Sequence, residues 1–138
     1  MSHQPMRILV VDDDPTARLL MRAALEKSGY EVCLAENGKD ALCQIRLQSF
    51  DLVMLDVEMP GLNGYQVCAQ LRQEMGNELP IIMVTGMDDY ESIEKAFASG
   101  ATDFIAKPIS WGLIGHRVKY LLRAYRVLQD LHASNARN

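Results

Sequence analysis

Long hydrophobic runs are absent from this sequence of 138 residues. None of its apolar stretches approaches the roughly 18 consecutive residues that a membrane-spanning helix needs, which argues against a membrane protein. The first residues, MSHQPM, lack the charged and apolar regions of a signal peptide. We therefore expect a soluble protein of the cytoplasm that has no membrane partner.

Cysteine is scarce as well. The chain has three cysteines, Cys33, Cys43 and Cys68, which is an odd number, and they lack C-x-x-C spacing. Such a set predicts neither a disulfide framework nor a metal site made of thiolates. We expect three reduced thiols in buried or half-buried positions.

Basic residues are rare in most of the chain and gather at its C-terminal end. Residues 1–110 carry 9 Lys and Arg against 17 Asp and Glu, a net charge of −8. Residues 111–138 carry 5 against 1, a net charge of +4. Because an acidic body repels a phosphate backbone, we expect no direct binding of nucleic acid by the main part of the chain.

What the sequence does contain is an alternation of short apolar runs with segments of helical periodicity. The apolar runs are mostly continuous, as in strands buried on both faces, and they lie at 8–11, 32–35, 52–55, 81–84 and 104–106. Five such β-α units with short connections predict one α/β domain, in which helices cover both faces of a parallel sheet.

Capping residues and glycines mark the ends of the expected helices. The first helix starts behind Asp14 and Pro15 and stops at Gly29, and the second and third follow Asn37 and Asn63. The fourth opens at DDYES, where Asp88 and Glu91 have capping-box spacing, and the fifth starts after Ser110. The apolar residues expected to face the core in the first, third and fourth helices are Ala17, Leu20, Met21, Ala24, Leu25, Val67, Cys68, Leu71, Ile93, Ala96 and Phe97.

Polar residues end four of the five apolar runs. The carboxyl ends of parallel strands meet at one edge of a sheet, and ligands bind outside that edge. The residues that this rule brings together are Asp12, Asp13, Asp56, Thr85, Gly86 and Lys107.

Three carboxylates at one edge of a sheet require a cation. At a separation of about 4 Å and an effective dielectric constant near 20, each pair repels by about 4 kcal/mol. Oxygen ligands without nearby His or Cys favour a hard ion, and a partly hydrated Mg²⁺ suits a few carboxylates better than a Ca²⁺ cage does. The sequence therefore predicts a Mg²⁺ site at Asp12, Asp13 and Asp56.

Four motifs, VVDDD, LVMLDVEMPGLNG, IIMVTG and DFIAKPIS, stand in this order along the chain. Together they resemble the receiver domain of two-component response regulators over residues 6–122. The resemblance implies a flavodoxin-like (βα)₅ fold with strand order 2-1-3-4-5. It leaves residues 1–5 as a disordered tail and residues 123–138 as a helical extension or a linker to an output domain.

The resemblance also implies a function. Asp56 would accept a phosphoryl group from the phosphohistidine of a sensor kinase or a phosphotransfer protein, so the chain would be a signalling switch and not an enzyme in the usual sense. Asp13, Asp56 and the backbone carbonyl of Glu58 would ligate Mg²⁺, and Asp12 would hold it through water.

Further residues would bind the phosphoryl group and report it. The Lys107 ammonium and the Thr85 hydroxyl would contact its oxygens, and the small Gly86 would leave it room. The family pattern implies a cis Lys107–Pro108 bond and a switch in which Thr85 moves and Phe104 follows. Phe104 as an ordinary core residue remains the alternative.

The carboxylate of Glu58 allows two interpretations. It overhangs the phosphoryl pocket and alters the attack of water on the acyl phosphate, or it is a solvated loop side chain. The sequence does not distinguish them.

A haloacid-dehalogenase-like phosphatase is the rival hypothesis from the enzyme class. VDDDPT contains D-x-D-x-T, with Asp12 as the nucleophile and Asp14 as the acid. That family needs a further acidic pair after the lysine, and only Asp130 follows Lys107. The rival also leaves Asp56 without a role.

The basic C-terminal segment predicts an overlong last helix. Ile114, Val118, Leu121, Tyr125 and Leu128 recur at steps of 4, 3, 4 and 3, which is the spacing of a coiled-coil seam. We expect a continuous helix from about Ser110 to beyond Leu128 that protrudes from the body and pairs with a second chain. Binding of membranes or nucleic acid is the alternative for its basic residues, Arg117, Lys119, Arg123 and Arg126.

Overall fold

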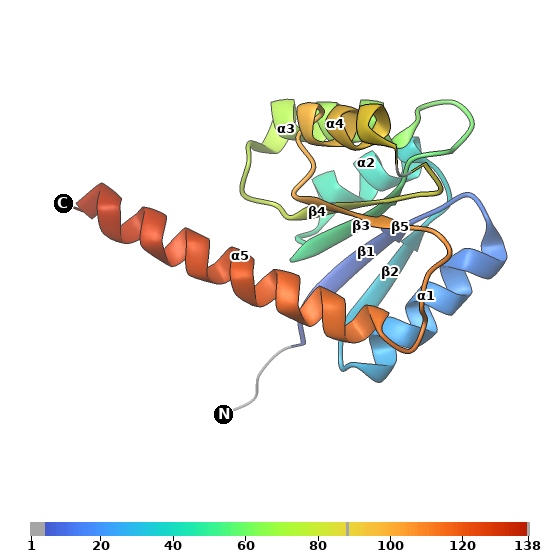
Figure 1. The fold of residues 1–138 in the computed structure, drawn as a ribbon, viewed down its shortest axis with the longest axis horizontal. Coiled ribbons are helices and arrows are strands. Elements are labelled where there is room, and N and C mark those ends of the chain that lie inside the picture. The colour runs from blue at the N-terminus through green and yellow to red at the C-terminus, as the bar shows by residue number, and fades with distance from the viewer. Residues whose placement is uncertain (1–4, 88, 138) are drawn as a thin grey trace.

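A computed structural model describes the backbone of residues 5–87 and 89–137, and the side chains as far as Leu131 (Figure 1). Apart from Pro5, the expected N-terminal tail lies outside the described residues. Five parallel strands form one sheet in the order β2-β1-β3-β4-β5, which confirms the predicted flavodoxin-like topology. The strands are β1 (Arg7–Val11), β2 (Glu31–Ala35), β3 (Leu52–Asp56), β4 (Ile81–Thr85) and β5 (Asp103–Ala106).

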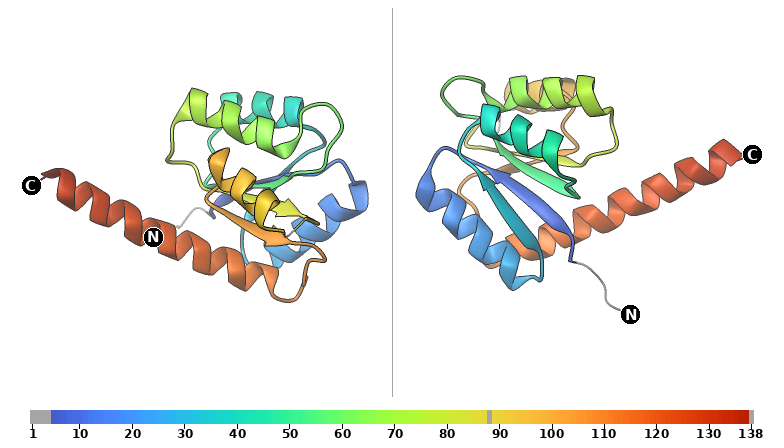
Figure 2. Two further views of the ribbon diagram at one scale, coloured as in Figure 1. Left: turned by 45° about the horizontal axis from the view of Figure 1, so that its top comes forward. Right: turned by 180° about the vertical axis from the view of Figure 1, so that it is seen from behind.

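Five helices cover the two faces of this sheet. They are α1 (Pro15–Lys27), α2 (Gly38–Leu47), α3 (Gly64–Met75), α4 (Tyr90–Ala98) and α5 (Ile114–Arg137). Helices α2, α3 and α4 lie on one face, and α1 and α5 lie on the other (Figures 1 and 2). The domain is therefore doubly wound, with a hydrophobic core on each side of the sheet.

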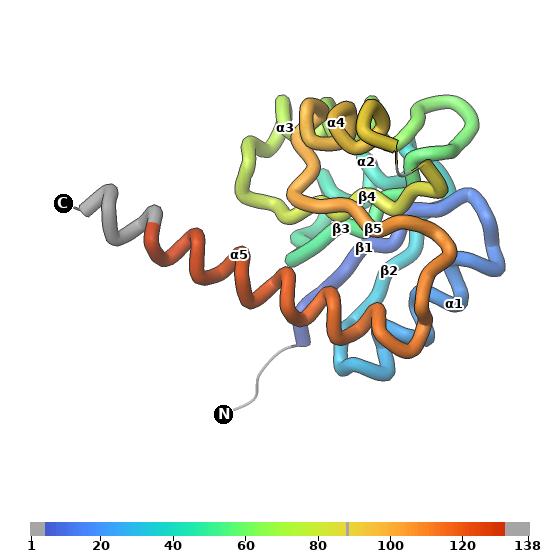
Figure 3. The backbone as a smooth tube through the Cα atoms, viewed as in Figure 1, coloured from blue at the N-terminus to red at the C-terminus, as the bar shows by residue number. Residues whose placement is uncertain are grey.

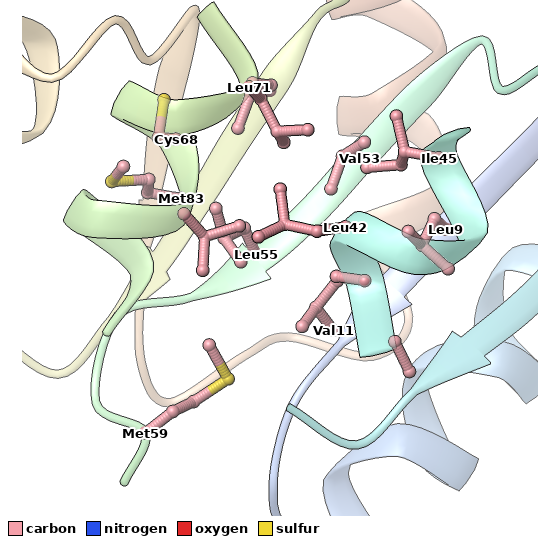
Figure 4. Packing of buried hydrophobic residues seen from close by; sticks show 14 of the residues in the cluster. Leu9, Val11, Leu42, Ile45, Val53, Leu55, Met59, Cys68, Leu71 and Met83 are labelled. Carbon is pink, nitrogen blue, oxygen red and sulfur yellow. The ribbon is translucent and has the colours of Figure 1, made fainter. Parts of the chain in front are cut away.

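Alternation along the strands divides the core into two clusters. In β1, Leu9 and Val11 face α2 and α3, whereas Ile8 and Val10 face α1 and α5. Figure 4 shows the first cluster, in which Leu42 of α2 packs among β-strand side chains. Because both sides of each central strand are buried, the continuous apolar runs in the sequence are explained.

Two apolar residues expected in the core are exposed instead. Leu20 has an exposed fraction of 43% because the buried face of α1 runs through Met21 and Leu25, one turn apart. Phe97 has an exposed fraction of 46%, since the neighbouring Ala96 occupies the position of α4 that faces the sheet. Predicting these two residues as core was wrong.

Two smaller expectations also need correction. Cys43 is exposed, on the outer side of α2, whereas Cys68 is buried and Cys33 is half-buried as expected. The N-cap of α4 is Asp89, whose carboxylate accepts a hydrogen bond from the Ser92 amide at 3.3 Å. The predicted cap, Asp88, lies outside the described residues.

Helix α5 is as long as the sequence predicts. The amides of Leu113 and Ile114 donate to the carbonyl of Ser110 in a turn, so the helix proper begins at Ile114. Its first part covers the sheet, and its later turns continue away from the body (Figure 3). No helix in the described part of the chain has an apolar stretch long enough to cross a bilayer.

The structure divides the predicted coiled-coil seam into two parts. Ile114 and Val118 are fully packed in the domain's own core, and Leu122 packs there as well. Leu128 has an exposed fraction of 64% and lies beyond that contact. The seam is therefore not free along its whole length, and pairing with a second chain stays a prediction for its outer part.

Candidate functional site

Three carboxylates meet at the carboxyl edge of the sheet, as predicted. Asp12 and Asp13 follow β1, and Asp56 is the last residue of the adjacent strand β3. One carboxylate oxygen from each of them lies within 4.8 Å of the others. Asp56 and Asp12 are almost fully buried, with exposed fractions of 2% and 8%, whereas Asp13 is exposed. This all-oxygen set fits a hard divalent cation.

Lys107 reaches the same site from the end of β5. Its ammonium lies 3.1 Å from Asp56 Oδ1 and donates a hydrogen bond to it. The backbone amide of Lys107 donates to the carbonyl of Thr85, which fixes Lys107 beside the last residue of β4. The Lys107–Pro108 peptide bond is cis, as the family pattern implies.

The charges at this site are unbalanced. Burial and the charge of Asp12 raise the pKa of Asp56 to about 6, although Lys107 acts in the opposite direction. Burial also raises the pKa of Asp12. Burial alone would lower the pKa of Lys107, but its hydrogen bond and charge interaction with Asp56 outweigh burial and raise it. Excess negative charge of this kind favours a bound cation.

Backbone contacts hold Asp12 in place. Its Oδ1 accepts a hydrogen bond from the Asp14 amide at 2.9 Å, and its carbonyl accepts one from the Arg18 guanidinium at 2.7 Å. Asp14 is exposed and serves as the N-cap of α1, since its carboxylate accepts from the Thr16 amide. The third aspartate of the DDD run is therefore a structural cap.

The hydroxyl of Thr85 connects two loops. It donates a hydrogen bond to Glu58 Oε1 at 2.9 Å and accepts one from the Met87 amide at 3.0 Å. Thr85 is buried, with an exposed fraction of 3%. Glu58 itself is exposed, yet its carboxylate is bonded to a residue of the site, which favours the interpretation that it overhangs the pocket. Nothing in the sequence indicated this bond.

Glycines leave space at two points of the site. A Cβ atom added at Gly86 would meet no heavy atom within 4 Å, so the space beside β4 is open. A Cβ at Gly64 would lie 2.6 Å from the carbonyl oxygen of Asp56. The first turn of α3 thus packs directly on the backbone that carries Asp56.

Phe104 lies on the same face of the sheet as Thr85. The register pairs Thr85 with Ala106, two residues after Phe104 in β5. The Phe104 ring is half-buried and packs edge to face on Phe97 of α4, with centroids 6.1 Å apart. This placement is compatible with either hypothesis for Phe104, so its part in a switch stays a prediction.

An apolar cavity adjoins the carboxylates and was not foreseen from the sequence. It has a volume of about 500 Å³ and extends from Asp56 and Lys107 between α1 and the sheet. Met21, Met54 and Trp111 contribute to its walls. Because Trp111 is the only tryptophan of the chain, its fluorescence reports on this region.

A doubly wound five-stranded sheet in this strand order, with acids and a lysine at its carboxyl edge, defines a flavodoxin-like fold with a ligand site at that edge. A family model described as the response regulator receiver domain matches residues 8–119. The chain therefore belongs to the receiver domain family of response regulators. Members of this family are signalling switches and not classical enzymes.

Individual relatives agree with this family. Response regulator MprA of Mycolicibacterium vanbaalenii is 42% identical over 119 residues, which are 86% of this chain and 51% of the relative. Chemotaxis protein CheY4 of Vibrio cholerae is 28% identical with a TM-score of 0.81, over 86% of this chain and 99% of that one. The BeF3-activated receiver domain of DrrB, from Thermotoga maritima, is 31% identical with a TM-score of 0.78, over 87% and 99%.

The chain spans about half the length of the curated relatives it matches. The phosphatase alternative gains no support from the family comparison, which identifies receiver domains. Its general acid, Asp14, is moreover engaged as a helix cap.

Proposed function

We propose that the chain is a phosphorylation-dependent signalling switch whose phosphoacceptor is Asp56. The proposal rests on the groups that surround the Asp56 carboxylate. It is buried at the end of β3, bonded to the Lys107 ammonium and close to two further carboxylates. Its donor would be a phosphohistidine on a sensor kinase or a phosphotransfer protein, and the setting would be the cytoplasm.

Mg²⁺ is the proposed cofactor, and the acidic cluster supports it. Asp13, Asp56 and the backbone carbonyl of Glu58 would hold the ion, with Asp12 acting through water. When bound, Mg²⁺ supplies positive charge that offsets the charge of the carboxylates and of the phosphoryl oxygens. Together with Lys107, it would reduce the repulsion between the Asp56 carboxylate and the incoming phosphoryl group.

The side chains of the site have separate tasks in the proposed transfer. An oxygen of Asp56 forms a bond to phosphorus while the bond between phosphorus and the donor histidine breaks. The Lys107 ammonium stays near Asp56 and stabilises the charge on the transferring oxygens. The Thr85 hydroxyl then donates a hydrogen bond to a phosphoryl oxygen, and the open space beside Gly86 accommodates the group.

The proposed output is a change of surface. Movement of Thr85 toward the phosphoryl group would free space for Phe104, which lies on the same face and contacts α4 through Phe97. Such a change would alter the binding of a partner or of a second copy of the chain. The relatives named as transcriptional regulators are about twice as long, so α5 is proposed to lead into an output domain.

Phosphorylation of the intact chain tests the proposal. Incubation with a small phosphodonor and Mg²⁺ should add one phosphoryl group, which mass spectrometry detects and peptide mapping locates at Asp56. Asp56→Asn should lose the label, while Asp14→Asn should keep it. Full labelling of Asp56→Asn, or labelling of Asp12 in the wild type, would contradict the proposal.

A further inference from the structure

The bond between Thr85 and Glu58 bears on how readily the switch operates. A hydroxyl has a single proton to donate. In this structure the proton of Thr85 is directed at Glu58 Oε1 at 2.9 Å, and a weaker acceptor, the Met87 carbonyl, lies at 3.4 Å. The proposed function requires the same proton for a phosphoryl oxygen on Asp56. The carboxylate of Glu58 and the phosphoryl group therefore compete for one donor.

The backbone around Glu58 is fixed, so this competitor is held in place. The residues on either side, Val57 and Met59, are buried, and Met59 is seen among the core side chains in Figure 4. The Val57 amide donates to the carbonyl of Val84, and the Met59 amide donates to the carbonyl of Val57. With both neighbours anchored inward, Glu58 faces the edge of the sheet and reaches Thr85.

The hydroxyl is held from its other side too. The Met87 amide donates to Thr85 Oγ1 at 3.0 Å, so the loop after β4 is part of the same arrangement. When Thr85 turns toward Asp56, it must leave Glu58 and change its bond to Met87. The loop after β3 and the loop after β4 are thereby linked through one oxygen atom.

We propose that the Glu58 carboxylate is a latch, a positioning residue that holds Thr85 in the unphosphorylated arrangement and sets how strongly a phosphoryl group must attract it. This inference rests on the proposed function of Asp56 and adds a regulator of that site. Removal of the latch should make the activated arrangement easier to reach. A hydrogen bond to a charged acceptor is strong enough to change the affinity for a phosphoryl mimic about tenfold.

Binding of beryllofluoride, a mimic of the phosphoryl group, measures this effect. With Mg²⁺ present, Glu58→Ala should bind beryllofluoride about tenfold more tightly than the wild type. Glu58→Gln keeps an acceptor for the proton but loses the charge, so its affinity should lie between the two. The matched control is Glu36→Gln, which removes an exposed charge that follows β2 at the same edge. It should change affinity less than twofold.

A second background isolates the hydrogen bond from the charge. Thr85→Val has no hydroxyl to release, so adding Glu58→Ala to it should change affinity less than twofold. The NMR signals of the Thr85 methyl and the Met87 amide should also move in Glu58→Ala, before any ligand is added, toward their positions in the beryllofluoride-bound wild type. This signature would not follow from a general loss of stability.

The outcomes separate the latch from the phosphoacceptor. Equal gains from Glu58→Ala in the wild type and in the Thr85→Val background, or equal effects of Glu58→Gln and Glu36→Gln, would overturn the latch and leave Asp56 in its role. Beryllofluoride binding that is unchanged in Asp56→Asn would overturn the proposed function itself. Should Glu58→Ala fold poorly, Glu58→Gln gives the decisive comparison.

Discussion

The two edges of the sheet differ in how well the charges and hydrogen bonds of their polar groups are balanced. At the carboxyl edge, Asp12 and Asp56 are buried beside one lysine, and the pKa of Asp56 rises to about 6. At the amino edge, the guanidinium of Arg72 donates to the carbonyls of Gly100 at 2.8 Å and Leu79 at 2.6 Å. The amino edge contributes to stability, whereas the carboxyl edge holds excess charge that a ligand can relieve.

The amino edge offers the largest expected loss of stability. Arg72→Ala removes the donor that joins the end of α3 to the segments before β4 and β5, and it leaves two half-buried carbonyls without a partner. We expect the free energy of unfolding to fall by about 4 kcal/mol, measured by urea denaturation. Arg22→Ala is the control, since its exposed pair with Glu26 should contribute less than about 0.5 kcal/mol. Equal losses would show that the bonds of Arg72 contribute no more than an exposed ion pair on a helix.

At the carboxyl edge, the metal-free protein should lose stability as the pH rises. The pKa of Asp56 in the folded chain, about 6, lies above its ordinary value of 3.8, so folding favours the protonated form. In metal-free protein this contribution is fully present below about pH 4 and is lost as the pH rises through about 6. The loss is on the order of 3 kcal/mol.

Comparison with Asp56→Asn isolates that contribution, because the amide does not titrate. Between about pH 4 and pH 7 in EDTA, the stability of the wild type should fall relative to that of the variant. Mg²⁺ should reduce the difference at the upper end of this range. If the difference in stability between the two proteins stays constant throughout, folding does not raise the pKa of Asp56.

Asp13→Asn should increase the stability of the metal-free protein by a smaller amount. Asp13 is exposed, so relief of its repulsion with Asp12 and Asp56 should stabilise the metal-free fold by about 1 kcal/mol. The same change should weaken stabilisation by Mg²⁺ in thermal denaturation. If instead Asp13→Asn lowers the metal-free melting temperature and leaves the effect of Mg²⁺ intact, Asp13 is a structural residue.

The smallest expected effect belongs to the contact of α5 with the amino edge. The hydroxyl of Tyr125 donates to the carbonyl of Glu78 in the loop before β4, and the carbonyl of Asn77 is a second acceptor at 3.1 Å. Tyr125→Phe should cost about 1 kcal/mol or less, because this contact is only half-buried. Tyr120→Phe, at an exposed position of the same helix, should cost nothing measurable by thermal denaturation.

The sequence is more informative about the carboxyl edge than about the amino edge. Strand ends could be predicted because polar residues terminate most of the apolar runs, and parallel topology then gathers Asp12, Asp56 and Lys107. Arg72 could not be predicted, since an arginine on a helix is expected at the surface until the loops that it bonds are placed. The direction of Glu58 was unforeseeable for a similar reason, because it depends on how its neighbours are anchored.

Helix positions show the same limit in the core. The period of 3.6 residues predicts which side of α1 faces inward but does not fix the width of the buried stripe. Met21 and Leu25 are buried while Leu20, at the margin of the stripe, is exposed. The sheet decides the width, and the sheet is assembled from residues far away in the sequence.

The length of α5 turns it into a lever arm. The helix starts soon after the Lys107–Pro108 segment and is last packed in the core at Leu122, so its fulcrum lies on the body of the domain. Among the described residues, the last hydrogen bond between α5 and the body is that of Tyr125. From there to Arg137 the helix extends about 18 Å, and a tilt of about 5° displaces its tip by about 1.6 Å. A side-chain rearrangement too small to alter the fold would thus shift the far end of α5. That shift would be large enough to change how this domain contacts a domain attached to the helix.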